Sequence, residues 1–465
     1  MPIVAHLPSP DKGLPTLPSA QDTRLALRKD LLATLAPIAA ARMTHALGEE
    51  VTAAIGRPKG QHRRGVVEAP TPLVCPTCGR RTNRQVVRKG SYPRTLLTLF
   101  GALALAVPRV ECDCGRCPPV PFTLVEAYNR LWSDAEGLLL SYSAVALSLR
   151  TSVQLLELPS GQTVSLGTAQ RRTGRLGRRA VHEMGQTLAA VPPVIMLDGL
   201  WGTVMQETGE RKRDKKGRLR TVKRGHKIPL LVALGVDPVT GESAVLAWVR
   251  GTAEGEADWT RLLTVLHERG VRAERGLRLF IHDGSAGLEA AFGMVDFGPV
   301  RRQRCLFHKL RNVLDAVHGT KEMTAAEKRE RRAAVLAEAC LVYEAPAAAG
   351  ARARLAAFAQ TWTDREPAAV ETFRRDFEQT LTFYAVQVEA TARGEAWGRV
   401  YLRSTSHLER VQRALRTKWR QAGAFWSAEG QDGAVWLVLH RRRQTGPEGA
   451  ARWQRTLLTA LLEPD

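Results

Sequence analysis

Hydrophobic residues in the first part of the chain mostly follow a helical spacing. Between residues 23 and 56 apolar positions recur every three or four residues, which predicts a helix, and the same texture returns over residues 131–185. Short apolar runs of β-like character lie between these segments, flanked by two groups of cysteines. Residues 1–20 are rich in proline and are expected to be disordered, and residues 56–65 (GRPKGQHRRG) indicate a basic linker.

From residue 191 the pattern changes to short, continuous apolar runs that are typical of buried strands. Three runs follow one another with hairpin-length links, and later strands alternate with helices. This order predicts an α/β domain with a mixed sheet flanked by helices. The strands are expected at 192–205, 228–237, 242–251 and 277–287, the helices at 258–270 and 288–295, a strand leading into a helix at 299–310, and helical structure from there to about 400.

Residues 152–180 combine a short helix, a turn at Pro159-Ser160-Gly161 and a second helix that starts near Ser165. A short turn followed by a basic helix is typical of a helix-turn-helix DNA-binding module. An ordinary helical hairpin with a solvated basic face fits the pattern equally well. The basic residues that would contact DNA are Arg171, Arg172 and Arg175.

The composition favours a polyanionic partner. The 465 residues, enough for roughly three domains at ~150 residues each, include 68 Lys and Arg against 46 Asp and Glu. Double-stranded DNA is the expected partner, and an anionic membrane surface is the rival. The chain has no continuous apolar run of ~18 residues and no evident secretory signal. A cytoplasmic protein whose seven cysteines are reduced or metal-bound is therefore expected.

Two acids stand where predicted buried strands end. Asp198 follows the apolar run VIML, and Asp283 follows LRLFIH. A buried, unpaired carboxylate is costly, so each should face a cation or water. Neighbouring carboxylates suggest an Mg²⁺ site, and paired ions suit phosphodiester chemistry. Both acids also precede glycine, and Asp-Gly favours turns, so either could be only a turn residue.

A third acid, Glu409, lies beside a helical apolar stripe formed by residues 408, 411, 415 and 419. A purely structural alternative is specific here. Ser406-x-x-Glu409 fits a capping box, in which the glutamate satisfies a backbone N–H at the start of the helix. Other acids could take the same place, among them Asp376, Glu395 and Glu429.

The cysteines near the N-terminus form two clusters, CPTCG and CDCGRC. A C-x-x-C turn presents two thiolates, and two such turns complete a tetrahedral Zn²⁺ site. The preferred structural zinc set is Cys75, Cys78, Cys114 and Cys117, with Cys112 as a substitute. The alternative is that these are ordinary reduced cysteines.

Cys305 and His308, in RCLFHKLRN, pose a separate question. They could be half of a metal site, a nucleophile with its base, or packing residues. A zinc site needs about two more ligands, and none lies nearby in the sequence. A nucleophilic cysteine needs an orienting acid and acyl chemistry, which the composition does not suggest.

Four motifs in order resemble DDE transposases of the Mutator-like superfamily, including bacterial insertion-sequence transposases with a C-x-x-H motif. They are LDGLWG at Asp198, HDGSAGLEAA at Asp283, QRCLFHKLRNVL at Cys305 and His308, and RSTSHLERVQRALRTKWRQAGAF at Glu409. The likeness covers roughly residues 190–440.

The resemblance implies an RNase H-like catalytic domain that cleaves element ends and transfers strands into target DNA. Asp198, Asp283 and Glu409 would hold two Mg²⁺ (or Mn²⁺) ions, and His308 would contact the scissile phosphate or orient an acid, with Cys305 packed beneath it. Two alternatives remain, a nuclease of the same fold without strand transfer and a non-catalytic, zinc-containing DNA-binding regulator.

The resemblance also completes the expected organisation. It implies a helical insertion within the catalytic domain, whereas the zinc-ribbon-like module and the helical, helix-turn-helix-like region before that domain are expected from the cysteine and helix patterns. A homodimer or larger assembly on DNA is expected. DNA contacts are expected from Lys309 and Arg311, and from Lys212, Arg213, Lys215 and Lys216 in a basic tract that could otherwise be a solvated surface. The six expected regions are 1–65, 66–125, 126–188, 189–310, 311–398 and 399–465.

Overall fold

The computed structural model describes residues 20–56, 59–60, 73–79, 86–120, 122–125, 131–145, 147–443 and 448–462. Most of the expected disordered segment 1–20 and of the basic linker 56–65 lies outside these ranges. The chain divides into two compact units, one formed by residues 1–139 and 150–166 and the other by residues 140–149 and 167–465.

The first unit combines a long helix with a two-stranded hairpin. Helix α1 (Ala20–Ile55) covers the predicted helical segment, and β1 (Val86–Thr98) pairs antiparallel with β2 (Gly101–Cys112). Alternate residues of β2 are buried, so that Leu103 and Leu105 pack with Leu47 of α1. The β-like runs between the cysteine clusters are thus confirmed as strands.

The helical prediction for residues 131–185 is confirmed by three helices. They are α2 (Ser133–Ala144), α3 (Leu149–Ser160) and α4 (Leu166–Met184). Pro159 belongs to the last turn of α3, and the break follows at Gly161, whose φ of 62° suits glycine. A helix-turn-helix function for α3 and α4 stays a prediction.

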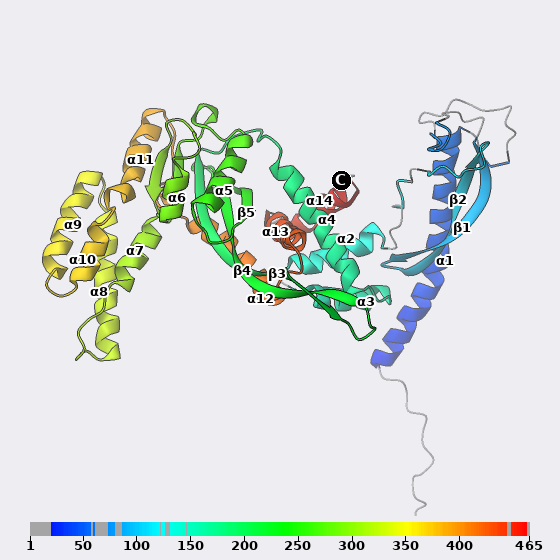
Figure 1. Cartoon of the computed structure of the whole chain (residues 1–465), viewed down its shortest axis with the longest axis horizontal. Helices are drawn as coiled ribbons and strands as arrows, with labels where there is room; N and C mark the ends of the chain where they lie inside the picture. Colours follow the sequence, from blue (N-terminus) through cyan, green and yellow to red (C-terminus); the bar gives the residue numbers. More distant parts are fainter. Residues whose placement is uncertain are drawn as a thin grey trace, which may run out of the picture. The chain divides into compact units, whose positions relative to one another are not determined.

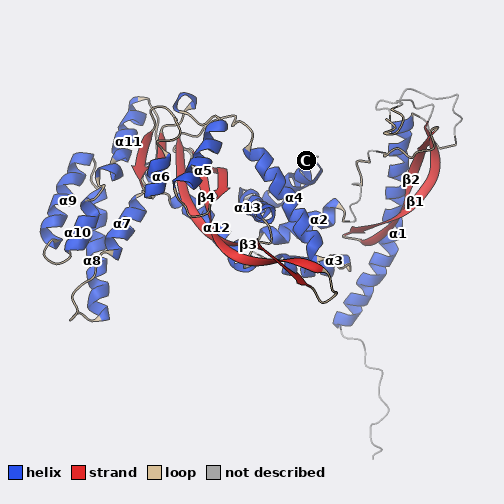
Figure 2. Cartoon of the chain, viewed as in Figure 1, coloured by secondary structure: helices blue, strands red, loops and turns tan. Residues whose placement is uncertain are grey.

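The second unit contains a mixed five-stranded sheet, as predicted. Its order is β5-β4-β3-β6-β7; the first three strands are antiparallel, and β3, β6 and β7 run parallel. Figures 1 and 2 label β3 and β4 of this sheet and the helices α5 and α6. Hairpins join β3 to β4 and β4 to β5, whereas the parallel strands need the crossover helices α5 (Glu256–Glu268) and α6 (Ala286–Ala291). The strands are β3 (Val194–Arg213), β4 (Leu219–Val236), β5 (Ser243–Arg250), β6 (Leu279–His282) and β7 (Arg301–Arg304).

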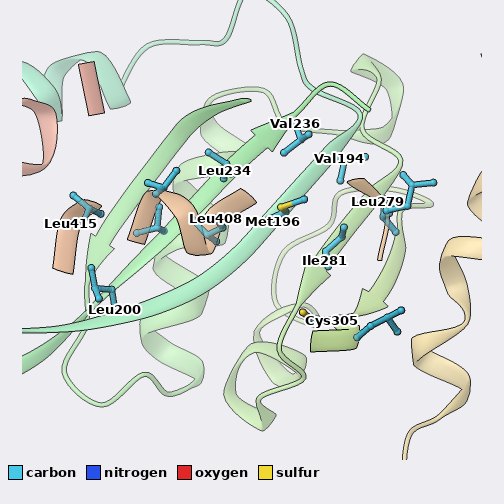
Figure 3. Packing of buried hydrophobic residues seen from close by; sticks show 14 of the residues in the cluster. Val194, Met196, Leu200, Leu234, Val236, Leu279, Ile281, Cys305, Leu408 and Leu415 are labelled. Carbon is cyan, nitrogen blue, oxygen red and sulfur yellow. The ribbon is translucent and has the colours of Figure 1, made fainter. Parts of the chain in front are cut away.

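The two faces of the sheet pack against different helices because side chains alternate along β3. Ile195 and Leu197 join the cluster that contains α5 and α6. Val194, Met196 and Leu200 join the cluster on the other face, which contains Leu408 and Leu415 of α12 (Ser406–Ala422) (Figure 3). The predicted apolar stripe of α12 is therefore the surface that packs on the sheet.

Beyond the sheet, β3 and β4 continue as a two-stranded arm (Figure 2). Pairing with β5 begins only at Leu230, and pairing with β6 extends only to Met196. The arm contains a register shift between Glu207 and Arg211, and Asp214 closes its tip by accepting the N–H groups of residues 216 and 218. The basic tract 211–227 is therefore the outer part of a hairpin.

The rest of the second unit is helical, in agreement with the sequence pattern. An aromatic cluster that includes Phe358, Phe373 and Phe377 packs the inserted helices together. The helices are α7 (Leu306–Asp315), α8 (Ala325–Tyr343), α9 (Ala348–Trp362), α10 (Pro367–Arg374), α11 (Thr382–Ala392), α13 (Ala428–Arg443) and α14 (Gly449–Leu462), with 3₁₀ turns η2 (Ala273–Arg275), η3 (Glu378–Thr380) and η4 (Arg399–Tyr401).

Candidate active site

Asp198 lies within β3 rather than at its end. Gly199 continues the strand and pairs with Leu231 of β4, so the turn interpretation of this Asp-Gly pair is wrong. What ends near Asp198 is the pairing of β3 with β6. Asp198 alternates with Met196 and Leu200 and therefore points to the face that α12 covers, where it is only 9% exposed.

The register of the sheet brings Asp283 opposite Asp198. Met196 pairs with Ile281 in the parallel ladder, and each aspartate lies two residues further along its chain. Asp283 also accepts the N–H of Ser285 (2.9 Å), and Gly284 has a φ of 84°. The turn interpretation is thus correct for Asp283, and the same turn holds its carboxylate at the end of β6.

Glu409 is not part of a capping box. Helix α12 has Thr405 as its N-cap, Ser406 as its first residue and no side-chain cap in the described structure. The Oε1 atom of Glu409 is buried and has no hydrogen-bond partner among the described residues. One turn along the helix, Gln412 donates to the carbonyl of Gly199 (3.2 Å), so the same helical face approaches β3 beside Asp198.

The electrostatics couple the two aspartates to His308. Burial raises the pKa of Asp198 to about 6, and Asp283 and Glu254 act in the same direction while His308 opposes them. Burial alone would lower the pKa of His308, but the Cys305 sulfur and then the two aspartates outweigh it and raise this pKa to about 9. The surroundings of His308, the two aspartates among them, therefore favour its protonated form.

Glu254 is a fourth carboxylate at this site, and no sequence motif indicated it. It lies in the loop before α5 with a φ of 59°, and its Oε2 accepts the indole N–H of the exposed Trp201 (2.9 Å). A Cβ on Gly199 would lie 2.1 Å from its Oε1, so the glycine makes room for this carboxylate. Burial, and then the charge of Asp283, raises the pKa of Glu254.

The donor chemistry of this acid centre, defined as Asp198, Asp283 and Glu409, fits hard divalent cations. Its carboxylates are buried or partly buried oxygen ligands, and one oxygen of Glu409 has no described partner. Among the described residues they are not a group whose ligand atoms all lie within 4.8 Å. Two ions about 3.5–4 Å apart would use ligands spread more widely than that.

Four thiols do form such a group in the first unit. Cys75, Cys78, Cys112 and Cys114 have sulfur atoms that all lie within 4.8 Å of one another, including pairs at 3.5 Å (Cys75–Cys114) and 3.7 Å (Cys78–Cys112). Sulfurs about 2.3 Å from one tetrahedral ion lie about 3.8 Å apart, so the spacing fits zinc. Backbone N–H groups of residues 78 and 77 point at the Cys75 sulfur and lower its pKa to about 6.

The structure replaces Cys117 of the predicted set with Cys112. Strand β2 ends at Cys112, which is buried, and a tight turn follows in which the N–H of Gly115 bonds to the Cys112 carbonyl (2.8 Å). With a φ of 79° at Gly115, this turn brings Cys114 back beside the other thiols. Cys117 lies after the turn and is exposed.

Lys309 is not placed to contact DNA, and that prediction is wrong. It is 1% exposed, and its ammonium donates to the carbonyls of Thr372 (2.7 Å) and Arg375, at the end of α10. It therefore holds α7 against α10. Burial lowers its pKa to about 8.

The other predicted basic contacts lie on or near the surface. Arg311 is exposed and pairs with Asp315 (3.9 Å), and Arg171 is exposed on α4, where Arg172 and Arg175 are half-buried. In the arm Lys212, Arg213, Lys215 and Lys216 are all exposed. No helix in the described part of the chain is long and apolar enough to cross a membrane.

The sequence model described as "Transposase, Mutator family" matches residues 75–444, a span that includes both the thiols and the acid centre. The chain belongs to this family of transposases. It is thus a DNA transposase, an enzyme that cuts and joins DNA.

Individual relatives agree. The transposase of insertion sequence IS406 from Burkholderia multivorans is 28% identical over 74% of this chain and 79% of its own length. The transposase of IS905 from Lactococcus lactis is 24% identical over 74% and 76%. Among solved structures, the Drosophila P element transposase strand transfer complex matches 73% of this transposase and 82% of that chain with 10% identity and a TM-score of 0.27, which is too low to inform the fold.

Proposed function

We propose that this transposase is a DDE enzyme with an RNase H-like catalytic domain. Asp198, Asp283 and Glu409 would hold two Mg²⁺ (or Mn²⁺) ions. The reaction would be hydrolysis of a phosphodiester at each element end, followed by attack of the freed 3′-OH on target DNA. The observation that carries the proposal is the parallel register that aligns Asp198 with Asp283 on the face covered by the helix of Glu409.

The residues of the centre have separate roles in this proposal. When bound, the ions would lower the pKa of the attacking water or 3′-OH and stabilise the leaving oxygen. His308, whose protonated form its surroundings favour, would donate to the scissile phosphate or orient an aspartate. Trp201 and Glu254 border the centre, and Gln412 fixes α12 to β3.

DNA binding would use several surfaces outside the centre. Zn²⁺ held by Cys75, Cys78, Cys112 and Cys114 would complete a zinc-ribbon-like module that positions an element end. Exposed cations of the β3–β4 arm, with Arg171 on α4, would contact phosphates and position the duplex without reading its sequence. We propose a homodimer or larger complex on paired element ends only because the chain belongs to this transposase family.

The test compares Asp198→Asn with Asp364→Asn, a control at an exposed residue between α9 and α10 of the helical insertion. Labelled DNA carrying the ends that flank the gene is incubated with each protein in Mg²⁺, and cleaved and target-joined products are separated. We expect Asp198→Asn to lose both products and to keep end binding, and Asp364→Asn to behave as wild type. Full cleavage by Asp198→Asn would refute the proposal.

Joined product separates a transposase from a nuclease of the same fold. Wild-type protein should yield target DNA covalently linked to the element 3′ end. Cleavage without any joined product, under conditions where a pre-cleaved end is supplied, would favour the nuclease.

A further inference from the structure

Cys305 is a buried cysteine with an unusual pair of contacts. It is fully buried, and its sulfur lies 3.3 Å from the hydroxyl of Thr405. The backbone N–H of Thr405 donates to the same sulfur, also at 3.3 Å. The next residue, Leu306, donates its N–H to the carbonyl of Arg403 (2.9 Å). Two neighbouring residues therefore attach the start of α7 to the segment that leads into α12.

Thr405 is the N-cap of the helix that carries Glu409. Its carbonyl accepts the N–H of Glu409 (3.0 Å), which closes the first turn of α12. An N-cap threonine ordinarily uses its hydroxyl to accept an N–H of that first turn. In α12 no side-chain cap is formed, and the Thr405 hydroxyl is directed to Cys305 instead. The hydroxyl thus links the two helices rather than capping its own.

The other side of Cys305 is attached to the strand that precedes Asp283. The N–H of Cys305 donates to the carbonyl of His282 (2.7 Å), and Cys305 is itself the N-cap of α7, which carries His308 in its first turn. Figure 3 shows Cys305 next to Ile281 in the core on the α12 face of the sheet. Cys305 therefore contacts the strand before Asp283 and the N-cap of α12, and it begins the helix that carries His308, so it joins three segments that each carry a residue of the proposed reaction.

Other roles for this cysteine do not fit its surroundings. The side chain is 0% exposed, which leaves no access for a substrate to a nucleophile. Within the described ranges it belongs to no group of three or more metal-ligating side chains whose ligand atoms lie within 4.8 Å. Its sulfur instead accepts a buried N–H that would otherwise need another partner, and losing such a partner is costly.

We infer that Cys305 is a positioning residue that fixes the start of α12 and thereby sets Glu409 against Asp198 and Asp283. The inference rests on the proposed function, because it assigns the cysteine a role through the cation ligands. It gives the cysteine of the C-x-x-H motif a physical task distinct from that of His308.

The experiment uses the full-length chain and three variants. Cys305→Ala removes the acceptor, Cys305→Ser restores a side chain that can bond to Thr405, and Cys340→Ala is the control because Cys340 is an exposed cysteine of α8. Three properties are measured, namely Mn²⁺ binding by electron paramagnetic resonance, hydrogen exchange of residues 403–412 without metal, and the Mg²⁺ concentration for half-maximal cleavage.

We expect Cys305→Ala to bind Mn²⁺ about tenfold more weakly or worse, as is usual when a residue that orients metal ligands is lost. Its half-maximal Mg²⁺ concentration should rise in parallel, and the first turn of α12 should exchange faster. Cys305→Ser should recover most of each property, and Cys340→Ala should match wild type. Unchanged Mn²⁺ binding and unchanged exchange in a folded Cys305→Ala protein would overturn the inference, even if its maximal rate fell.

Thr405→Val keeps the test decisive if Cys305→Ala does not fold. It removes the hydroxyl contact and leaves the backbone N–H bond to the sulfur, so a smaller change in the same direction is expected; no change would overturn the inference.

Asp198→Asn separates the two proposals. If that variant cleaves normally, the proposed function fails; if it is inactive while the Cys305 and Thr405 variants bind Mn²⁺ normally, only the positioning role fails.

Discussion

The acid centre and the thiol cluster are both candidate metal sites, but they are assembled in different ways. The four thiols come from two short turns, each closed by local hydrogen bonds and a glycine with positive φ. The three acids come from β3, the end of β6 and α12, and only the sheet register and the packing of α12 bring these elements together. The cysteine turns are visible in the spacing, although the exact set of thiols is not, whereas the acid centre depends on the whole fold.

The strongest test of this comparison is Glu409→Gln, because the assignment of Glu409 depends most on tertiary structure. Loss of one carboxylate should lower cleavage by about 10³-fold, since a bound metal ion supplies several kcal/mol of charge stabilisation in the transition state. Gel-based cleavage assays in Mg²⁺ measure it. Glu395→Gln, which removes only a surface pairing with Arg393 (2.8 Å), should remain close to wild type. Equal activity of the two variants would exclude Glu409 from the centre.

The thiol cluster is tested by Cys112→Ser against Cys117→Ser. Zinc per chain, measured by atomic emission on protein purified without chelator, should fall from about one to well below one in Cys112→Ser, because a structural site needs all four ligands. End binding should weaken in the same variant, while Cys117→Ser keeps both zinc and binding. Zinc loss in Cys117→Ser alone would restore the set expected from spacing.

The extent of the acid centre is tested by Glu254→Gln. Glutamine keeps an acceptor for Trp201 and removes the charge, so Mg²⁺ affinity should fall by about tenfold, as for other groups that support metal ligands. The control is Glu256→Gln, an exposed neighbour in the first turn of α5. An identical Mg²⁺ requirement in wild type and both variants would confine the centre to three acids.

The smallest effect is expected from the arm. Replacing Lys215 and Lys216 with alanine should weaken DNA binding a few-fold and reduce the slope of log K against log salt by about 1.8, because each phosphate contact contributes about 0.9.

Lys309→Met should leave that slope unchanged and instead lower the free energy of unfolding by about 1–3 kcal/mol, since it leaves two buried carbonyls unpaired. A changed salt slope in Lys309→Met would contradict this expectation, because it would mean that Lys309 contacts a phosphate in the complex with DNA.

Sequence patterns predicted the elements better than their contacts. The helical spacing of residues 23–56 and the strand–helix order from residue 191 correspond to α1 and to the mixed sheet. The same patterns predicted an end of β3 that is too early. The apolar run stops near the edge of the five-stranded sheet, but the strand itself continues into the polar arm. The capping-box alternative for Glu409 failed because the helix begins one residue earlier than the motif requires, with Thr405 rather than Ser406 as its N-cap.

The type of a residue did not show whether its side chain is exposed or buried. Lys309 and Lys215 both lie in basic stretches, yet Lys309 is buried against α10 and Lys215 is exposed at the tip of the arm. Glu254 was missed because no local motif links it to Asp198; only Gly199 and the loop before α5 place it there.

The sequence by itself determined the periodicities, the two cysteine turns, the positive charge and the order of motifs that indicates the family. These properties depend on residues close together in the chain or on residue type alone. Only the tertiary structure decided that Asp198 and Asp283 follow paired positions of β3 and β6, that Cys112 replaces Cys117 among the thiols, and that Cys305 contacts Thr405. Strand register and helix packing decide these contacts, and both depend on burying the two faces of the sheet at once, which no single segment of the sequence specifies.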